Sequence, residues 1–155
     1  MITLYVDSDA CPVKPEVVRV AKRYGLEVIL VSNSWMRLPE DWKAKLVVVE
    51  GDFDAADNWI VEHLVKNDIV VTGDIPLAHR SIKAGARVIG HQGRLFTDEN
   101  IGNALATRDL LHVLRGGGEN MGGPPPFQNE DRSRFLQGLD QIIQDIKRDG
   151  SKPSI

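Results

Sequence analysis

Short apolar runs alternate with longer amphipathic segments along residues 1–115. The apolar runs contain few polar residues, which is typical of strands that are covered on both faces, as in a parallel sheet. They predict strands at residues 2–6, 26–31, 46–49, 68–72 and 87–89. Because helical patterns separate most of these strands, the sequence predicts βαβ units with right-handed crossovers.

The amphipathic segments have the spacing and the end signals of helices. In the first of them, apolar residues recur at intervals of three and four, which places them on one helical face: Val17, Val20, Ala21 and Tyr24. Proline near the start and glycine after the end mark helix boundaries. The predicted helices cover about 15–24, 55–66, 76–84, 98–115 and 129–148, and the segments 33–45 and 90–97 are predicted to be loops.

The last quarter of the chain differs in composition. Residues 116–126 contain five glycines and three prolines, which predicts a hinge at 116–127 without helix or strand. The segment 128–149 is amphipathic and predicts a final helix that packs on the same domain. The expected architecture is therefore a three-layer α/β/α domain at 1–115 with a mostly parallel five-stranded sheet, followed by the hinge and this helix.

Composition narrows the class of protein. No run approaches the roughly 18 apolar residues of a membrane span, and the chain opens into a strand without the pattern of a signal peptide. Cys11 is the one cysteine of the sequence, so no intrachain disulfide is possible and a reducing cytoplasm is expected. The formal net charge of −3 argues against indiscriminate binding to nucleic acid, although divalent cations at acidic clusters would offset it.

Aspartates gather where the predicted strands end. Asp7 and Asp9 follow the first strand, Asp54 and Asp57 come after the third, and Asp74 follows the fourth. In open parallel sheets the site lies beyond the carboxyl ends of the strands, where the strand order reverses. These side chains are far apart in the sequence. They are therefore expected to converge at the end of the sheet where the parallel strands terminate.

Each of these aspartates also has a purely structural interpretation. Asp57 lies on the apolar face of its helix, where a carboxylate is hydrogen-bonded, protonated or bound to a cation. A hydrogen bond to a strand end would satisfy it. Asp54 and Asp74 occupy positions suited to helix N-caps. Asp7 and Asp9 could form a strand-end turn in which one acid caps the next helix.

Carboxylates from several strand ends offer hard oxygen ligands. Such ligands suit Mg²⁺ or Mn²⁺, whereas zinc favours cysteine or histidine at close spacing. Two such ions a few ångströms apart can stabilise the attacking and leaving oxygens of a phosphodiester displacement, with water as the nucleophile. The predicted metal ligands are Asp7, Asp9, Asp54, Asp57 and Asp74, and the predicted catalytic residues are the same set without Asp54.

Other candidates have a weaker signal. Four cations, near strand ends or on the apolar side of a helix, could contact a phosphate backbone: Lys14, Arg80, Arg94 and Arg108. For Lys14, Arg80 and Arg94 the simpler interpretation is a solvated surface cation. For Arg108 it is an ion pair with a buried acid. Cys11 is expected to be a small buried thiol, and the scattered histidines lack metal-ligand spacing.

Several motifs in combination resemble a known family. They are VDSDACPVK at 6–14, FDAADNWIV at 53–61, DIVVTGDIPLA at 68–78, LFTDENI at 95–101, RDLLHVLR at 108–115 and GGPPPFQNEDRSRF at 122–135. Over nearly the whole chain they closely resemble the bacterial YaiI/YqxD family. That uncharacterised family is similar to PIN-like domains, whose α/β/α fold and acidic metal site serve mostly in ribonucleases. The resemblance implies a PIN-like fold with Asp7, Asp9, Asp57 and Asp74 at the acidic positions.

The chain departs from the family pattern at two places. Gly73 stands where alanine is expected, and Gly90-His91-Gln92-Gly93 replaces an Asn-Pro-Arg-Gly type of loop. If that arginine contacts substrate in relatives, Arg94 would have to replace it here.

These patterns lead to three functional hypotheses. The first is a Mg²⁺- or Mn²⁺-dependent nuclease that hydrolyses phosphodiester bonds in RNA or another nucleic acid. The second is a module that binds RNA or a partner protein and keeps an acidic pocket without catalysis. The third is a phosphatase of the haloacid dehalogenase type, because Asp7-Ser8-Asp9 resembles its nucleophile and acid pair; the following Cys11-Pro12 and the lack of an evident motif lysine disfavour it.

Overall fold

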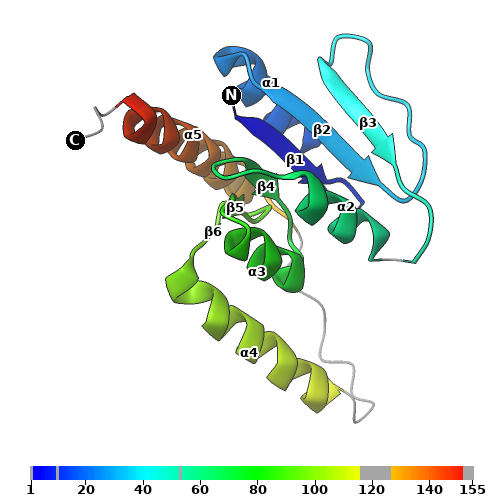
Figure 1. The fold of residues 1–155 in the computed structure, drawn as a ribbon, viewed down its shortest axis with the longest axis vertical. Coiled ribbons are helices and arrows are strands. Elements are labelled where there is room, and N and C mark those ends of the chain that lie inside the picture. The colour runs from blue at the N-terminus through cyan, green and yellow to red at the C-terminus, as the bar shows by residue number, and fades with distance from the viewer. Residues whose placement is uncertain (1, 10, 53, 116–126, 152–155) are drawn as a thin grey trace.

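The computed structural model describes residues 2–9, 11–52, 54–115 and 127–151, apart from the side chains of 108–115 and 150–151. The strands are β1 (Thr3–Asp7), β2 (Glu27–Ser32), β3 (Ala44–Val48), β4 (Ile69–Val71), β5 (Arg87–Ile89) and β6 (Leu95–Phe96). The helices are α1 (Lys14–Tyr24), α2 (Ala55–His63), α3 (Ile75–Lys83), α4 (Asp98–Arg115) and α5 (Asn129–Ser151) (Figure 1). The predicted α/β fold is confirmed, while the predicted hinge lies outside the described residues except for residue 127.

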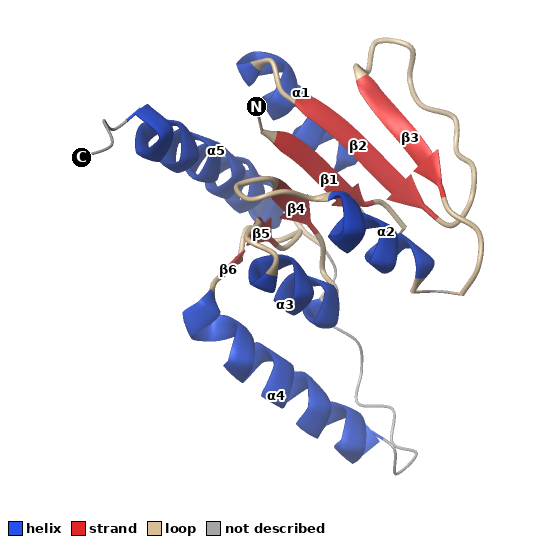
Figure 2. Ribbon diagram, viewed as in Figure 1, coloured by secondary structure: helices blue, strands red, loops and turns tan. Residues whose placement is uncertain are grey.

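The strands form one sheet in the order β3-β2-β1-β4-β5-β6 (Figure 2). β1 pairs in parallel with β2 on one side and with β4 on the other, and β3 and β5 extend the parallel sheet in both directions. The strand order therefore reverses between β1 and β4. In folds of this type, ligands bind beyond the carboxyl ends of the strands at this reversal.

The sheet has six strands where the sequence predicts five, because part of the predicted loop 90–97 pairs antiparallel with β5 as β6. The turn closes through the N–H of Gly90, which donates to the carbonyl of Arg94 at 2.8 Å. Gly93 has a φ of 88°, and a Cβ there would lie 2.6 Å from the backbone of Arg134 in α5, so the turn requires glycine. Two residues are too few to show an alternating pattern, and periodicity could not reveal this strand.

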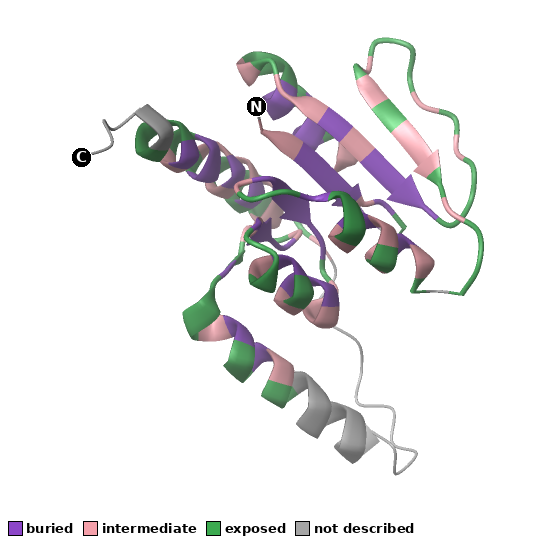
Figure 3. Ribbon diagram, in the orientation of Figure 1, coloured by how far each residue is buried: buried purple, intermediate pink, exposed green. Residues whose placement is uncertain are grey.

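Helices cover both faces of the sheet and give the predicted three layers (Figure 1). On one face α1 and α5 enclose a core with the central strands that includes Leu4, Val6, Val17, Val20, Phe135, Leu139 and Ile143. On the other face α2, α3 and the start of α4 enclose a second core that includes Tyr5, Ile60, Val70, Leu77 and Ile101. The central strands are buried, whereas β3 at the edge is more exposed (Figure 3).

α2 ends at His63, three residues earlier than predicted. Asp68, which is 2% exposed, accepts hydrogen bonds from the backbone N–H groups of Val65 at 2.9 Å and Thr3 at 3.1 Å. These bonds fasten the segment before β4 to the start of β1. Leu64, the C-cap of α2, is already extended with ψ of 150°. Asp68 then closes the following turn locally through Val65 and joins it to β1 through Thr3.

α5 packs on the domain through an apolar face and through polar contacts with α1. Arg132 forms an ion pair with the buried Glu16, and the Tyr24 hydroxyl donates a hydrogen bond to Asp140. The helix begins at the predicted residue and continues three residues beyond the predicted end. Among the helices of the described chain, none has the length and apolar content needed to cross a membrane.

Candidate active site

Asp7 and Asp74 lie on either side of the reversal in strand order. Asp7 is the last residue of β1, and Asp74 is the N-cap of α3, directly after β4. Thr72 joins them: its hydroxyl donates to Asp7 Oδ2 at 2.9 Å and accepts from the Asp74 N–H at 3.0 Å. Asp74 Oδ1 also accepts from the N–H of Leu77 at 3.4 Å, so its predicted capping role is confirmed while its charge still faces the cluster.

Asp57 brings a third carboxylate from the first turn of α2. Burial raises its pKa to about 7, with further increases from the charges of Asp74, Asp7 and Asp54, in that order, and an opposing effect of Arg80. No hydrogen bond or ion pair satisfies Asp57 within the described part of the chain. The structural alternative of a hydrogen bond to a strand end is therefore wrong, and like charges accumulate around Asp57 with Arg80 offsetting only part of their effect.

The pKa of Asp7 is also raised. Burial is the main cause, the hydrogen bond from Thr72 opposes it, and the charges of Asp74 and Asp9 add to it. Thr72 is a site residue that the sequence analysis missed. Its signal was a polar residue at the end of an otherwise apolar strand, two positions before an aspartate.

Asp9 and Asp54 lie at the margin of the cluster, and both are exposed. Asp9 turns toward the end of β2, where its Oδ1 lies 2.8 Å from the Ser32 hydroxyl and its Oδ2 accepts from the N–H of Asn33 at 3.0 Å. Asp54 occupies the N-cap position of α2, but its side chain makes no capping hydrogen bond. Its effect on the pKa of Asp57 still places its charge close to the cluster.

The carboxylate oxygens of the cluster are the kind of ligand that a hard divalent cation prefers, but their arrangement does not form a complete binding site. Within the described ranges, no three His, Cys, Asp or Glu side chains are close enough together to form a complete metal-ligand group. Mg²⁺ commonly keeps several waters and binds through only one or two carboxylates. Asp7 and Asp74 are the two carboxylates that would hold such an ion; Thr72 bonds the carboxylate of Asp7 and the backbone N–H of Asp74, and both charges act on Asp57.

The predicted cations are spread around the carboxyl ends of the strands. Lys14 Nζ donates to the carbonyl of Ser8 at 3.1 Å, and Arg80 donates to Asn58 Oδ1 at 2.8 Å beside Asp57. The Arg94 guanidinium lies over the Phe96 ring at 5.1 Å from its centroid, in the β5–β6 turn. The side chain of Arg108 is outside the described residues. A role in substrate binding stays a prediction for all four.

His91 and Cys11 are two further groups near the site whose surroundings shift their pKa values. His91 lies against Gly73, where a Cβ would be 3.4 Å from its ring, and its buried Nε2 has no hydrogen-bond partner in the described structure. Burial and the charge of Lys14 lower the pKa of His91. Cys11 is buried, as predicted, and burial raises the pKa of its thiol to about 11.

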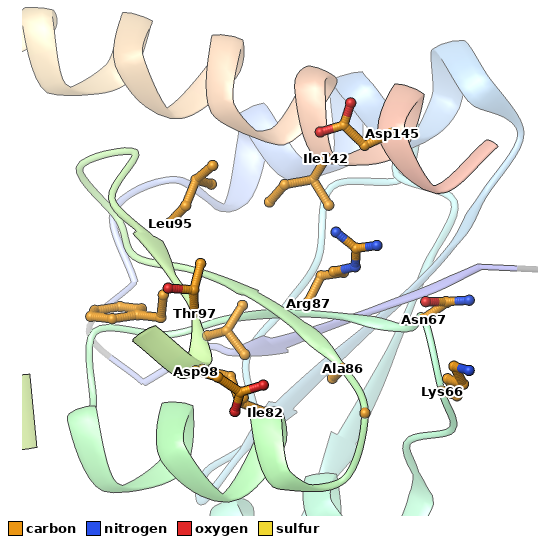
Figure 4. A pocket seen from close by; sticks show the side chains of 13 residues that line it. Lys66, Asn67, Ile82, Ala86, Arg87, Leu95, Thr97, Asp98, Ile142 and Asp145 are labelled. Atoms are coloured by element: carbon orange, nitrogen blue, oxygen red, sulfur yellow. The ribbon is translucent and has the colours of Figure 1, made fainter. Parts of the chain in front are cut away.

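A cavity of about 390 Å³ lies at the opposite, amino end of β4 and β5, between α3, β6 and α5 (Figure 4). Its lining combines apolar side chains such as Ile82, Leu95 and Ile142 with Arg87 and Asp145. None of the five candidate aspartates lines it. The acidic cluster is therefore the stronger candidate site, since burial and like charges raise the pKa values of Asp57 and Asp7 and it lies where the strand order reverses.

The fold and the site together define a three-layer α/β domain with an acidic cluster at the reversal in strand order. The chain belongs to the YaiI/YqxD family, because residues 5–145 match the family model described as "Uncharacterized BCR, YaiI/YqxD family". A UPF0178 protein of Parvibaculum lavamentivorans is 53% identical over 148 residues, which cover 96% of this chain and 97% of the relative. A UPF0178 protein of Rhodospirillum centenum is 51% identical over 152 residues, covering 96% and 99% of the two chains.

These relatives carry no assigned activity in their names, so the family membership does not by itself supply a function. No solved structure matches the chain. The relationship to PIN-like domains stays a prediction from the sequence motifs.

Proposed function

We propose that the protein is a Mg²⁺- or Mn²⁺-dependent nuclease that hydrolyses phosphodiester bonds, with RNA as the preferred substrate. The observation that carries this proposal is the environment of Asp57, whose pKa is about 7 because it is buried among the charges of Asp74, Asp7 and Asp54. A phosphodiester is itself anionic and would be repelled by these carboxylates. A divalent cation would relieve the repulsion among them and attract the substrate to the same place.

The chain's own residues have distinct parts in this proposal. Thr72 orients the Asp7 carboxylate, and the N-terminus of α3 fixes Asp74, so both acids have defined positions before any ligand binds. A divalent cation held by them would supply Lewis-acid stabilisation of the negative charge that develops on the phosphate. Lys14 and Arg80 are the nearby cations that could neutralise the flanking backbone phosphates.

The direct test is Mn²⁺-dependent hydrolysis of single-stranded RNA by wild type and by Asp7→Asn. The neutral amide removes one charge from the cluster, and we expect the rate to fall on the order of 100-fold or more. Asp98→Asn is the matched control, because Asp98 is an exposed acid that lines the cavity at the opposite edge. Equal rates for wild type and Asp7→Asn would remove the nuclease proposal.

A non-catalytic module that binds RNA or a protein is the second candidate. The observation that favours it is that no complete metal-ligand group is formed among the residues described. A calorimetric titration with Mn²⁺ separates the two functions. The nuclease requires Mn²⁺ binding that Asp7→Asn weakens, whereas the binding module would retain its partner after chelation and would cleave nothing.

A further inference from the structure

Trp35 stands out among the large apolar side chains of the described chain. It is 73% exposed, compared with 62% for Val65 and 42% for Val48. The other two tryptophans are held by the protein: Trp59 stacks on His63 with ring centroids 3.8 Å apart, and Trp42 packs against a core. No aromatic ring contact involves Trp35 within the described structure, so most of a large aromatic surface remains in water.

The acidic site anchors the segment that leads to Trp35. Asp9 accepts the N–H of Asn33 at 3.0 Å and lies 2.8 Å from the Ser32 hydroxyl. The same hydroxyl accepts the N–H of Ser34 at 3.1 Å. Trp35 is two residues beyond Asn33, so their α-carbons are at most about 7 Å apart. Trp35 therefore lies just beyond the carboxyl end of β2, at the same end of the sheet as the carboxylates.

The surroundings of Trp35 are polar and include a cation. Asn33, Ser34 and Arg37 are all exposed, and Arg37 lies in an irregular segment beside a hollow of about 290 Å³ that it lines with Leu38, Pro39 and Glu40. An interface with a second copy of the chain would have a broader apolar centre. An exposed aromatic ring followed closely by an arginine instead matches the chemistry by which proteins hold single-stranded nucleic acid.

We propose that Trp35, assisted by Arg37, stacks on an unpaired nucleobase of a strand bound at the acidic site. This inference rests on the proposed function and deepens it, because it assigns the selectivity for single strands to one side chain. In a duplex the faces of the bases are covered by their neighbours, so an indole on the protein surface cannot stack on them. Trp35 thus favours single-stranded over duplex substrates without reading their sequence.

The test measures binding separately from cleavage. Fluorescence anisotropy with a fluorescein-labelled oligouridylate and a labelled blunt-ended RNA duplex, in Ca²⁺, compares wild type with Trp35→Ala, Trp35→Phe and Val65→Ala. We expect Trp35→Ala to weaken oligouridylate binding by about 5- to 100-fold, with little change for the duplex. Trp35→Phe should restore most of the affinity, and the exposed control Val65→Ala should behave as wild type.

Three results would overturn the proposal. They are unchanged oligouridylate binding in Trp35→Ala, equal losses for oligouridylate and duplex, or a wild-type dimer in sedimentation that Trp35→Ala converts to monomer. The nuclease proposal is read separately, from Mn²⁺-dependent hydrolysis of bis(p-nitrophenyl) phosphate, which has no nucleobase. Val65→Ala should leave that hydrolysis unchanged while Asp7→Asn abolishes it; if wild type shows none, the nuclease proposal fails and the binding result still decides the role of Trp35.

Discussion

Asp68 is a buried aspartate and Asp57 a half-buried one, and both lie beside the central strands. Asp68 is at the amino end of β4, whereas Asp57 is near the carboxyl ends of the strands. Asp68 is 2% exposed and accepts two backbone N–H groups, from Thr3 and Val65. Asp57 is half-buried, has no such donor in the described structure, and faces the charges of Asp74 and Asp7. Burial is common to both residues, so the missing donors and the like charges are what distinguish a candidate site from a structural contact.

The largest effect on stability is expected at the structural aspartate. In Asp68→Asn the amide oxygen can accept one of the two N–H groups, but the NH₂ group faces the other and leaves a buried donor unsatisfied. We expect the free energy of unfolding to fall by about 2 kcal/mol at pH 7, measured by urea denaturation. A loss no larger than that of the exposed control Asp98→Asn would show that these two hydrogen bonds contribute little.

Asp57→Asn is expected to change the free energy of unfolding in the opposite direction and to stabilise the protein above neutral pH. Because the pKa of Asp57 is about 7 in the folded protein and close to 3.8 when unfolded, the folded state binds more protons between these values. Wild-type stability therefore decreases from this group as the pH rises from about 4 to about 7, and is level above that range. The variant should match wild type near pH 4 and be more stable at pH 8, by about 1 kcal/mol after solvent screening of this half-exposed group.

Urea denaturation across this pH range measures the difference between wild type and Asp57→Asn. A constant difference from pH 4 to pH 8 would contradict the raised pKa. The same experiment on Asp68→Asn provides the comparison, because that variant should be destabilised at neutral pH.

The smallest effect concerns the cation beside Asp57. Arg80 opposes the rise in the pKa of Asp57, but it is exposed and bonded to Asn58, so its charge is screened. In Arg80→Gln the pKa of Asp57 should rise by a few tenths of a unit, measured by carboxyl NMR titration at low salt. Lys83→Gln, which removes another exposed cation of α3, should leave the pKa of Asp57 unchanged. A lower pKa of Asp57 in Arg80→Gln would show that the Arg80 guanidinium does not act on Asp57 as a nearby positive charge.

Most of the elements were predictable because their signals are local. α4 has the predicted bounds, and α5 begins at the predicted residue. The chemistry of the site was also predictable in part. Parallel strands align their carboxyl ends, so acids that follow separate strands, such as Asp7 and Asp74, come together once the sheet forms.

Contacts between distant residues decided the order of the strands. They also decided which hydrogen-bond partners the buried and site-forming aspartates have. Sequence periodicity could not show that Asp9 turns toward Asn33, that Asp68 binds the start of β1, or that Trp35 remains exposed. The sequence by itself determined most of the strands and helices, though not β6, and which strand ends are acidic, because side-chain spacing and turn residues act over a few positions. Only the tertiary structure decided which carboxylates receive hydrogen bonds and which repel one another, because their partners are brought close by the packing of separate elements.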